Sequence, residues 1–68
     1  MSGGIYKYIE IVGTSSKSIE DAIEAAVAEA SKSVRHIQWL EVKDTRGRIE
    51  NGKVAEYQVT VRLGFKID

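Results

Sequence analysis

Two side chains in the second half of the sequence have the chemistry to bind a planar ring. Trp39 is the sole tryptophan, and its indole could either stack on a ring or anchor a contact between subunits, where aromatic residues are enriched. Gln58 carries an amide that offers a donor and an acceptor together, which suits the edge of an imide or a pyrimidine. An exposed glutamine on a strand is more often simply solvated. The residues alone therefore leave a ligand site and an oligomer interface as alternatives.

Four basic residues lie on or near the expected strands: Arg46, Arg48, Arg62 and Lys66. A guanidinium can donate two parallel hydrogen bonds to a phosphate, so an anionic ligand is one use for them. Pairing with carboxylates of the neighbouring strands, such as Glu41 and Glu56, is the alternative that we favour. The basic residues by themselves therefore do not establish a phosphate contact.

The residue types needed for catalysis are scarce. The chain has one histidine and no cysteine, so it lacks the pairing of a nucleophile with a general base that nucleophilic catalysis needs. It also lacks the thiolates of a structural zinc site. Residues 13–16 precede the expected helix, but they lack the lysine and the glycine spacing of a P-loop. The carboxylates are too scattered for a calcium loop. We therefore predict a binding protein that is not an enzyme and that has no metal site.

Length and charge narrow the classes of partner. Ten basic and ten acidic residues cancel, so no overall field draws the chain to nucleic acid or to a membrane surface. No apolar run approaches the roughly 20 residues of a membrane span, and the first residues lack the blocks of a signal peptide, so we expect a cytoplasmic protein. Residues 1–68 are expected to form a single domain. Without disulfides or a structural metal, a domain this small is expected to gain stability by oligomerisation.

The strongest structural signal is an amphipathic helix over residues 18–34. Its apolar positions recur at helical spacing: Ile19, Ala22, Ile23, Ala26, Val27, Ala30 and Val34. Ser18 is expected to cap the first turn, with Asp21 as the reciprocal partner of a capping box. Lys32, Arg35 and His36 are expected near the other end, where positive charge complements the helix dipole.

Three stretches rich in β-branched and aromatic residues predict strands at 5–12, 37–48 and 54–67. Residues 13–17 are expected to form a polar loop. Asn51 and Gly52 tolerate positive φ, so they are expected to form the centre of a type I′ turn between the last two strands. The predicted fold class is α+β in β-α-β-β order, with the third strand in the middle of an antiparallel sheet and the helix on one face.

That turn fixes an expected register for the hairpin. The helix-facing pairs are Gln38 with Phe65, Leu40 with Leu63, Val42 with Val61, and Asp44 with Val59. The pairs on the other face are Trp39 with Gly64, Glu41 with Arg62, Lys43 with Thr60, and Thr45 with Gln58. Trp39 and Gln58 then share a face but lie six residues apart, roughly 20 Å at ~3.3 Å per residue. A ligand touched by both must therefore receive them from different subunits.

Several segments together resemble the dodecin family. They are IEIVGTS at 9–15, DAI at 21–23, WLEV at 39–42, RG at 46–47, EYQV at 56–59 and GFK at 64–66. The resemblance covers nearly the whole chain in the same order and without a large insertion. It implies a three-stranded antiparallel sheet wrapped around one helix, assembled as a hollow homododecamer of 23 symmetry.

The same resemblance implies a function. Dodecins bind flavins without catalysing a reaction, and the type case stacks them in pairs between trimers, which implies flavin storage and quenching of flavin photochemistry. Trp39 corresponds to the residue that stacks on the isoalloxazine ring, and Gln58 to the residue that hydrogen-bonds its pyrimidine edge. Bacterial members tend to hold FMN, with riboflavin or a related flavin as the alternative, so Arg46 is the first candidate for the phosphate contact and Lys66 the second. Some members bind coenzyme A at a separate site to which we assign no residues.

Two alternatives remain at this point. The chain could be a structural oligomeric module in which Trp39 only joins subunits and no flavin binds. It could also be a calcium-associated dodecin, although such members lack the tryptophan and the glutamine that this chain retains at Trp39 and Gln58.

Overall fold

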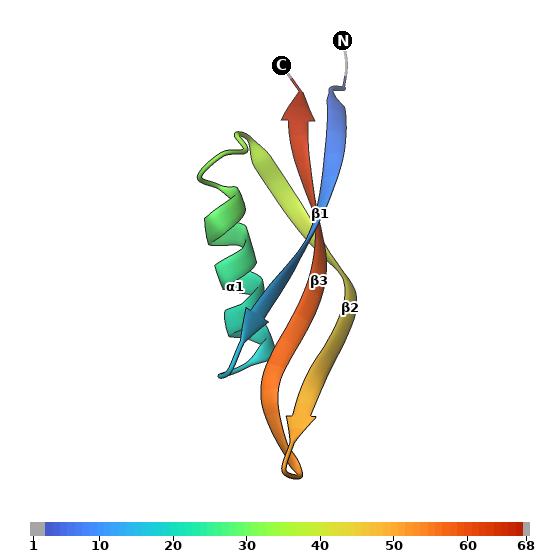
Figure 1. Ribbon diagram of the computed structural model, residues 1–68. Coiled ribbons are helices and arrows are strands. Elements are labelled where there is room, and N and C mark those ends of the chain that lie inside the picture. The colour runs from blue at the N-terminus through green and yellow to red at the C-terminus, as the bar shows by residue number, and fades with distance from the viewer. Residues whose placement is uncertain (1–2, 68) are drawn as a thin grey trace.

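The computed structural model describes residues 3–67 and has the predicted β-α-β-β order. Its elements are β1 (Ile5–Ser15), α1 (Ile19–Ala30), β2 (Ile37–Glu50) and β3 (Lys53–Ile67). The strands form one antiparallel sheet in the order β1-β3-β2, which confirms that the third strand lies in the middle. The helix packs along one side of the sheet, and the hairpin of β2 and β3 projects beyond it (Figure 1).

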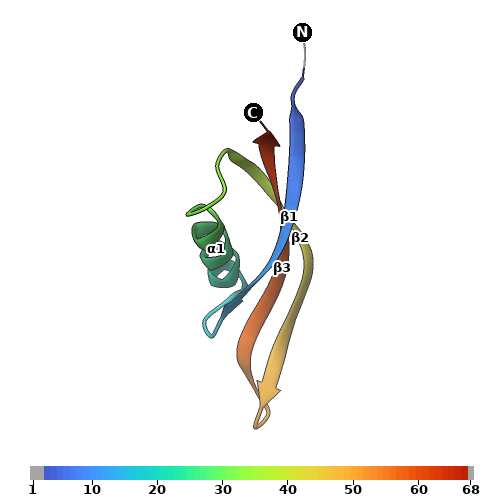
Figure 2. The same ribbon diagram turned by 45° about the horizontal axis from the view of Figure 1, so that its top comes forward.

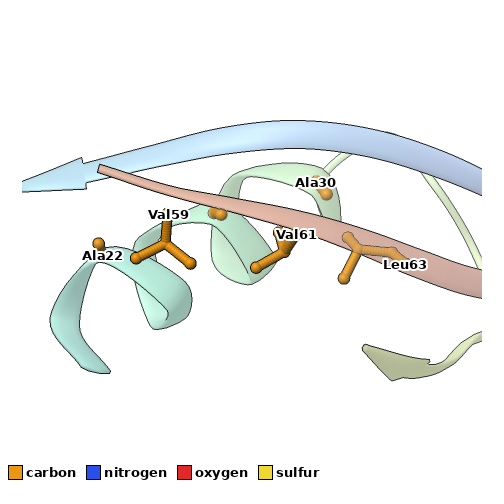
Figure 3. Packing of buried hydrophobic residues seen from close by; sticks show 6 residues of the cluster. Ala22, Ala30, Val59, Val61 and Leu63 are labelled. Atoms are coloured by element: carbon orange, nitrogen blue, oxygen red, sulfur yellow. The ribbon is translucent and has the colours of Figure 1, made fainter. Parts of the chain in front are cut away.

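The core lies between β3 and α1. Val59, Val61 and Leu63 are fully buried on the side of β3 that faces the helix (Figure 3). The helix meets them with three buried alanines, Ala22, Ala26 and Ala30. These small side chains let the helix approach the sheet closely. Gly13 on β1 shows how closely, because a Cβ there would overlap the carbonyl oxygen of Ala22.

The start of the helix follows the prediction only in part. The Ser18 hydroxyl accepts a hydrogen bond from the backbone N–H of Asp21 at 2.9 Å, as expected for an N-cap. The reciprocal half of the capping box is wrong. The Asp21 carboxylate accepts from the Ser15 hydroxyl at 2.7 Å, and the oxygen of that hydroxyl accepts from the backbone N–H of Lys17 at 2.9 Å.

The helix ends at Ala30 and not at Val34, and its last turn contains no basic residue. The predicted dipole contacts of Lys32, Arg35 and His36 are therefore wrong. Two backbone bonds that span three residues, from Lys32 to Glu29 and from Ser33 to Ala30, tighten the chain just past the helix. The chain then reverses into β2 through His36, which has a φ of 63°.

The strands are longer than predicted at three ends. β1 continues through Ser15, because Gly13 and Thr14 pair with β3, so a loop over residues 13–17 is wrong. β2 runs to Glu50 and β3 begins at Lys53, which leaves a two-residue turn. Asn51 and Gly52 have φ values of 52° and 74°, confirming the positive φ expected at both central positions.

The hairpin register is confirmed in its middle and beside the turn, and it is wrong in between and at the start of β2. Trp39 lies opposite Gly64, and the expected pairing continues to Val42 opposite Val61. A bulge at Lys43 shifts β2 by one residue as far as Arg48, and an irregularity between Arg48 and Ile49 restores the expected pairing beside the turn. A further irregularity at Gln38 pairs Ile37 with Phe65. The predicted pairs that fail are Gln38 with Phe65, Lys43 with Thr60, Asp44 with Val59, and Thr45 with Gln58.

The shift in β2 changes which side chains share a face of the sheet. In an unbroken register Asp44 would lie on the helix side opposite Val59, and Thr45 would lie on the other side opposite Gln58. This part of β2 is exposed, so the shift exchanges the positions of exposed side chains. With the bulge, Asp44 lies opposite Thr60 and Arg46 lies opposite Gln58.

The only helix in residues 3–67 covers one side of the sheet, and the other side is bare in this single chain (Figure 2). Leu40, Val42 and Ile49 on β2 are large apolar residues that also stay exposed, and Leu40 and Val42 do so on the helix side of the sheet, opposite Leu63 and Val61. None of the helical residues described forms a segment of the length and hydropathy that a membrane crossing requires. So much exposed apolar area on so small a protein favours association with further copies.

Candidate functional site

The candidate site lies on the sheet surface opposite α1, called here the outer face. Val59, Val61 and Leu63 point toward the helix. Successive side chains of a strand alternate between its two faces, so the even-numbered neighbours from Gln58 to Lys66 belong to the outer face. Trp39 joins them from β2, where it lies opposite Gly64.

Trp39 forms the centre of the aromatic end of the outer face, defined by Trp39, Gly64, Tyr6 and Tyr8. The indole lies directly on Gly64, where a Cβ would overlap three atoms of the ring. The Tyr6 ring is tilted against it at a centroid distance of 5.1 Å, and the Tyr8 ring meets it edge-on at 5.9 Å. Because 38% of Trp39 remains exposed, the indole can still stack on a planar ligand.

Tyr8 is held by its own neighbours. Its hydroxyl donates to Glu41 Oε2 at 3.3 Å, and the Arg62 guanidinium lies over its ring at 5.0 Å from the centroid. Arg62 also pairs with Glu10 at 3.5 Å. These contacts hold the Tyr8 side chain in place by residues other than Trp39.

Gln58 forms the centre of the polar end of the outer face, defined by Gln58, Arg46, Glu56 and Arg48. Arg46 Nε donates to Gln58 Oε1 at 2.9 Å, and Gln58 Nε2 donates to Glu56 Oε1 at 3.1 Å. Glu56 also faces Arg48, whose Nε lies 3.9 Å from the same carboxylate oxygen. The half-buried amide of Gln58 is therefore part of a hydrogen-bonded row.

The two ends remain separate within one chain. Gln58 and Gly64 are six residues apart on β3, and Gly64 carries the indole. The separation is roughly 20 Å at ~3.3 Å per residue, as the predicted register required. The structure thus brings Arg46 to Gln58, but it does not bring Gln58 to Trp39.

Lys66 lies at the aromatic end, where it pairs across the sheet with Tyr6. It also borders an open hollow of about 410 Å³, whose other basic residues, Lys7 and Arg35, lie on the helix side of the sheet. The two residues predicted as candidates for a phosphate contact therefore lie at opposite ends of the outer face. Only Lys66 lies near Trp39.

Sequence reasoning missed the contact between Glu56 and Gln58. Glu56 was interpreted only as a partner for basic residues, and its ion pair with Arg48 confirms that part. The signal for the missed contact was the spacing of two residues along one strand, which places both side chains on one face.

Comparison with known proteins gives a consistent result. A family model described as Dodecin matches residues 5–68. A dodecin from Thermus thermophilus is 48% identical over 66 residues, which cover 97% of this chain and 96% of that protein. The solved dodecin from Streptomyces coelicolor has a TM-score of 0.94 at 43% identity, covering 100% of this chain and 97% of the other. A calcium dodecin from Mycobacterium tuberculosis, described as having a novel calcium-binding site, has a TM-score of 0.82 at 31% identity and covers 94% and 91%.

Proposed function

The chain belongs to the dodecin family, and from this premise we propose that it binds a flavin, in the first place FMN, between copies of itself. Dodecins are small-molecule-binding proteins and not enzymes. The observation that carries the proposal is the exposed indole of Trp39 seated on Gly64. A ring held from behind by a strand and left open on its surface is a stacking platform for an isoalloxazine.

The energetics call for more than one tryptophan. Stacking on an aromatic side chain contributes roughly 1 to 3 kcal/mol, whereas micromolar affinity needs about 8 kcal/mol. The difference must come from further stacking, from hydrogen bonds at the ring edge and from the phosphate. Since Trp39 and Gln58 lie roughly 20 Å apart in one chain at ~3.3 Å per residue, two subunits must supply them.

The assembly that we propose is a closed homododecamer of 23 symmetry. Exposed apolar residues on β2, among them Leu40 and Val42, support association with other copies. Twelve copies of a 7.5 kDa chain have a mass of about 90 kDa, and closed symmetry predicts one narrow species in solution. Each copy is proposed to contribute residues 1–68 as a single domain.

Lys66 is the better candidate for the phosphate contact. It lies at the same end as Trp39 and pairs across the sheet with Tyr6, whose ring contacts the indole. Arg46 is bound to Gln58, so it would meet the ring edge rather than a phosphate at the end of the ribityl chain. We therefore propose that Lys66 contacts the phosphate and that Arg46 acts at the polar end, beside the ring edge.

The proposed role is storage of FMN and suppression of its photochemistry. An indole in contact with an excited flavin can transfer an electron to it and quench its fluorescence. Stacking on both ring faces would also keep other molecules from the reactive ring. Riboflavin would share the ring contacts and lack the contact with Lys66.

The test is titration of FMN with the apoprotein while flavin fluorescence and oligomer size are followed. The wild type is expected to quench the fluorescence, and Trp39→Ala is expected to weaken binding by about fivefold to 150-fold, from the 1 to 3 kcal/mol of stacking. Tyr57→Phe is the matched control, because Tyr57 lies on the other side of β3. Unchanged fluorescence, or quenching that survives Trp39→Ala, would contradict the proposal.

A second candidate function is calcium binding, which the likeness to the calcium dodecin favours. Calorimetric titration with calcium and with coenzyme A, each before and after FMN, tests both ligands on the same sample. Heat from calcium in a protein that leaves FMN fluorescence unchanged would favour the second candidate.

A further inference from the structure

We propose that Glu56 is a positioning residue that, together with Arg46, holds the Gln58 amide in one of its two orientations and so selects rings with an imide edge. The inference rests on the proposed flavin function and deepens it. It concerns the polar end alone, and it assigns to Glu56 a role that acts through Gln58 and not through direct contact with the ligand.

The two contacts of the amide are chemically directional. Arg46 can only donate, and it donates to Gln58 Oε1 at 2.9 Å. A carboxylate can only accept, and Glu56 Oε1 accepts from Gln58 Nε2 at 3.1 Å. A half-turn of the amide would set its NH₂ group against a guanidinium and its oxygen against a carboxylate. Both hydrogen bonds would then be lost, so the flanking residues specify a single orientation.

The shifted register between Lys43 and Arg48 makes this arrangement possible. It places Arg46 opposite Gln58, where an unbroken register would place Thr45. A threonine hydroxyl both donates and accepts, so Thr45 would satisfy either orientation of the amide. Arg46 discriminates between the orientations because it has no acceptor.

Glu56 is itself held in place. Arg48 Nε lies 3.9 Å from the carboxylate oxygen of Glu56 that Gln58 uses, and Arg48 Nη1 lies 3.4 Å from Glu50 Oε2. Glu56 lies two residues before Gln58 on the same strand, so its side chain projects from the same face. The charges of Arg46, Glu56, Arg48 and Glu50 alternate in sign along this row of contacts.

The orientation determines what the amide can still offer. A primary amide has two N–H donors and two acceptor lone pairs, and Glu56 and Arg46 use one of each. One donor and one acceptor remain in a fixed order. An imide edge presents a carbonyl oxygen beside an N–H, which is the complementary pair. A ring whose imide nitrogen carries no proton would leave the remaining acceptor of Gln58 unpaired.

The experiment compares riboflavin with its N3-methyl derivative, which keeps the ring and lacks the imide proton. Neither probe has a phosphate, so Lys66 does not contribute to the comparison. The wild type is expected to bind the methylated probe about tenfold more weakly, the scale of one lost hydrogen bond with a group left unpaired. Glu56→Ala is expected to weaken riboflavin binding about fivefold and to reduce the preference between the two probes.

Two variants separate positioning from a general electrostatic effect. Glu50→Ala removes a carboxylate that contacts Arg48 and neither Glu56 nor Gln58, so its effect on both affinities is expected to be smaller than that of Glu56→Ala. In a Gln58→Ala background, Glu56→Ala is expected to have no further effect, because its role is exercised through Gln58. Glu56→Gln is expected to be intermediate, since its amide can accept from Gln58 in one orientation only.

The possible failures are distinguishable. A wild type that binds no riboflavin would overturn the proposed function and the positioning role with it. Riboflavin binding with an unchanged preference between the probes in both Glu56→Ala and Glu56→Gln would overturn the positioning role alone. An effect of Glu56→Ala that persists in the Gln58→Ala background would show that Glu56 acts on the ligand directly, and would equally overturn it. Oligomer size is measured for each variant so that only assembled protein is compared.

Discussion

Trp39 at one end of the outer face and Gln58 at the other are held in place by different physical means. The indole is positioned by shape, because it lies on Gly64 between the rings of Tyr6 and Tyr8. The amide is positioned by donors and acceptors, because Arg46 and Glu56 each satisfy one of its two groups. The first arrangement is sensitive to added volume, whereas the second is sensitive to changed hydrogen bonding.

Both ends include residues of β3, the strand that also carries buried core residues. Leu63 is buried directly beside Gly64 in the sequence, and Val59 is buried beside Gln58. The support behind the two ends is therefore alike, and the difference between them arises on the outer face. Substitutions on that face can test the comparison without removing the core.

Adding one carbon atom at the aromatic end is expected to have the largest effect. In Gly64→Ala the new Cβ would overlap the indole, so Trp39 must leave its place. We expect the free energy of unfolding to fall by about 1 to 3 kcal/mol, as for other overpacked sites, and riboflavin affinity to fall by about tenfold or more. Chemical denaturation and fluorescence titration measure the two effects.

Gly4→Ala is the control for that substitution. Its Cβ would first meet the flexible end of Lys66, at 3.0 Å from Cε, and Lys66 can move aside. We expect little change in stability or riboflavin binding. A Gly64→Ala variant that binds as well as Gly4→Ala would show that the position of the indole does not depend on shape.

Removing a donor at the polar end is expected to have a smaller effect. Arg46→Ala deletes the group that holds Gln58 Oε1, and one such hydrogen bond on an exposed surface contributes about 1 kcal/mol, or about fivefold in riboflavin affinity. Thr45→Ala is expected to leave the affinity unchanged, because Thr45 lies opposite Val59 and not opposite Gln58. If the two variants lost equal affinity in the same titration, the bulged register would be contradicted.

The smallest effect is expected for a substitution on the part of the outer face between the two ends. Glu10→Gln breaks the ion pair between Glu10 and Arg62. The side chain of Glu10 is 52% exposed and that of Arg62 is 32% exposed. Pairs exposed to this extent contribute roughly 0.2 to 1 kcal/mol, and salt screens them. We expect the loss in unfolding free energy at low salt to disappear at high salt, measured at one protein concentration. A loss that is large and independent of salt would mean that Arg62 supports the aromatic end through more than its charge.

Local chemistry explains what could be predicted. Ser18 caps the helix and Asn51 with Gly52 forms the hairpin turn, because each depends on a few neighbouring residues. Counting from the turn also predicts Trp39 opposite Gly64, and the count holds because the shift that begins at Arg48 is reversed at Lys43. The helix end was missed because apolar spacing continues to Val34, although the chain must already reverse toward β2.

The amino-acid sequence by itself determined the order of the elements, the family and the side chains available to a ring. Only the tertiary structure decided which neighbours those side chains have. The turn fixes the pairing only beside itself, whereas the register farther along depends on how β2 and β3 pair over their whole length. The shifted register between Lys43 and Arg48 places Arg46 opposite Gln58 and gives the amide its orientation, a consequence that no local pattern carries.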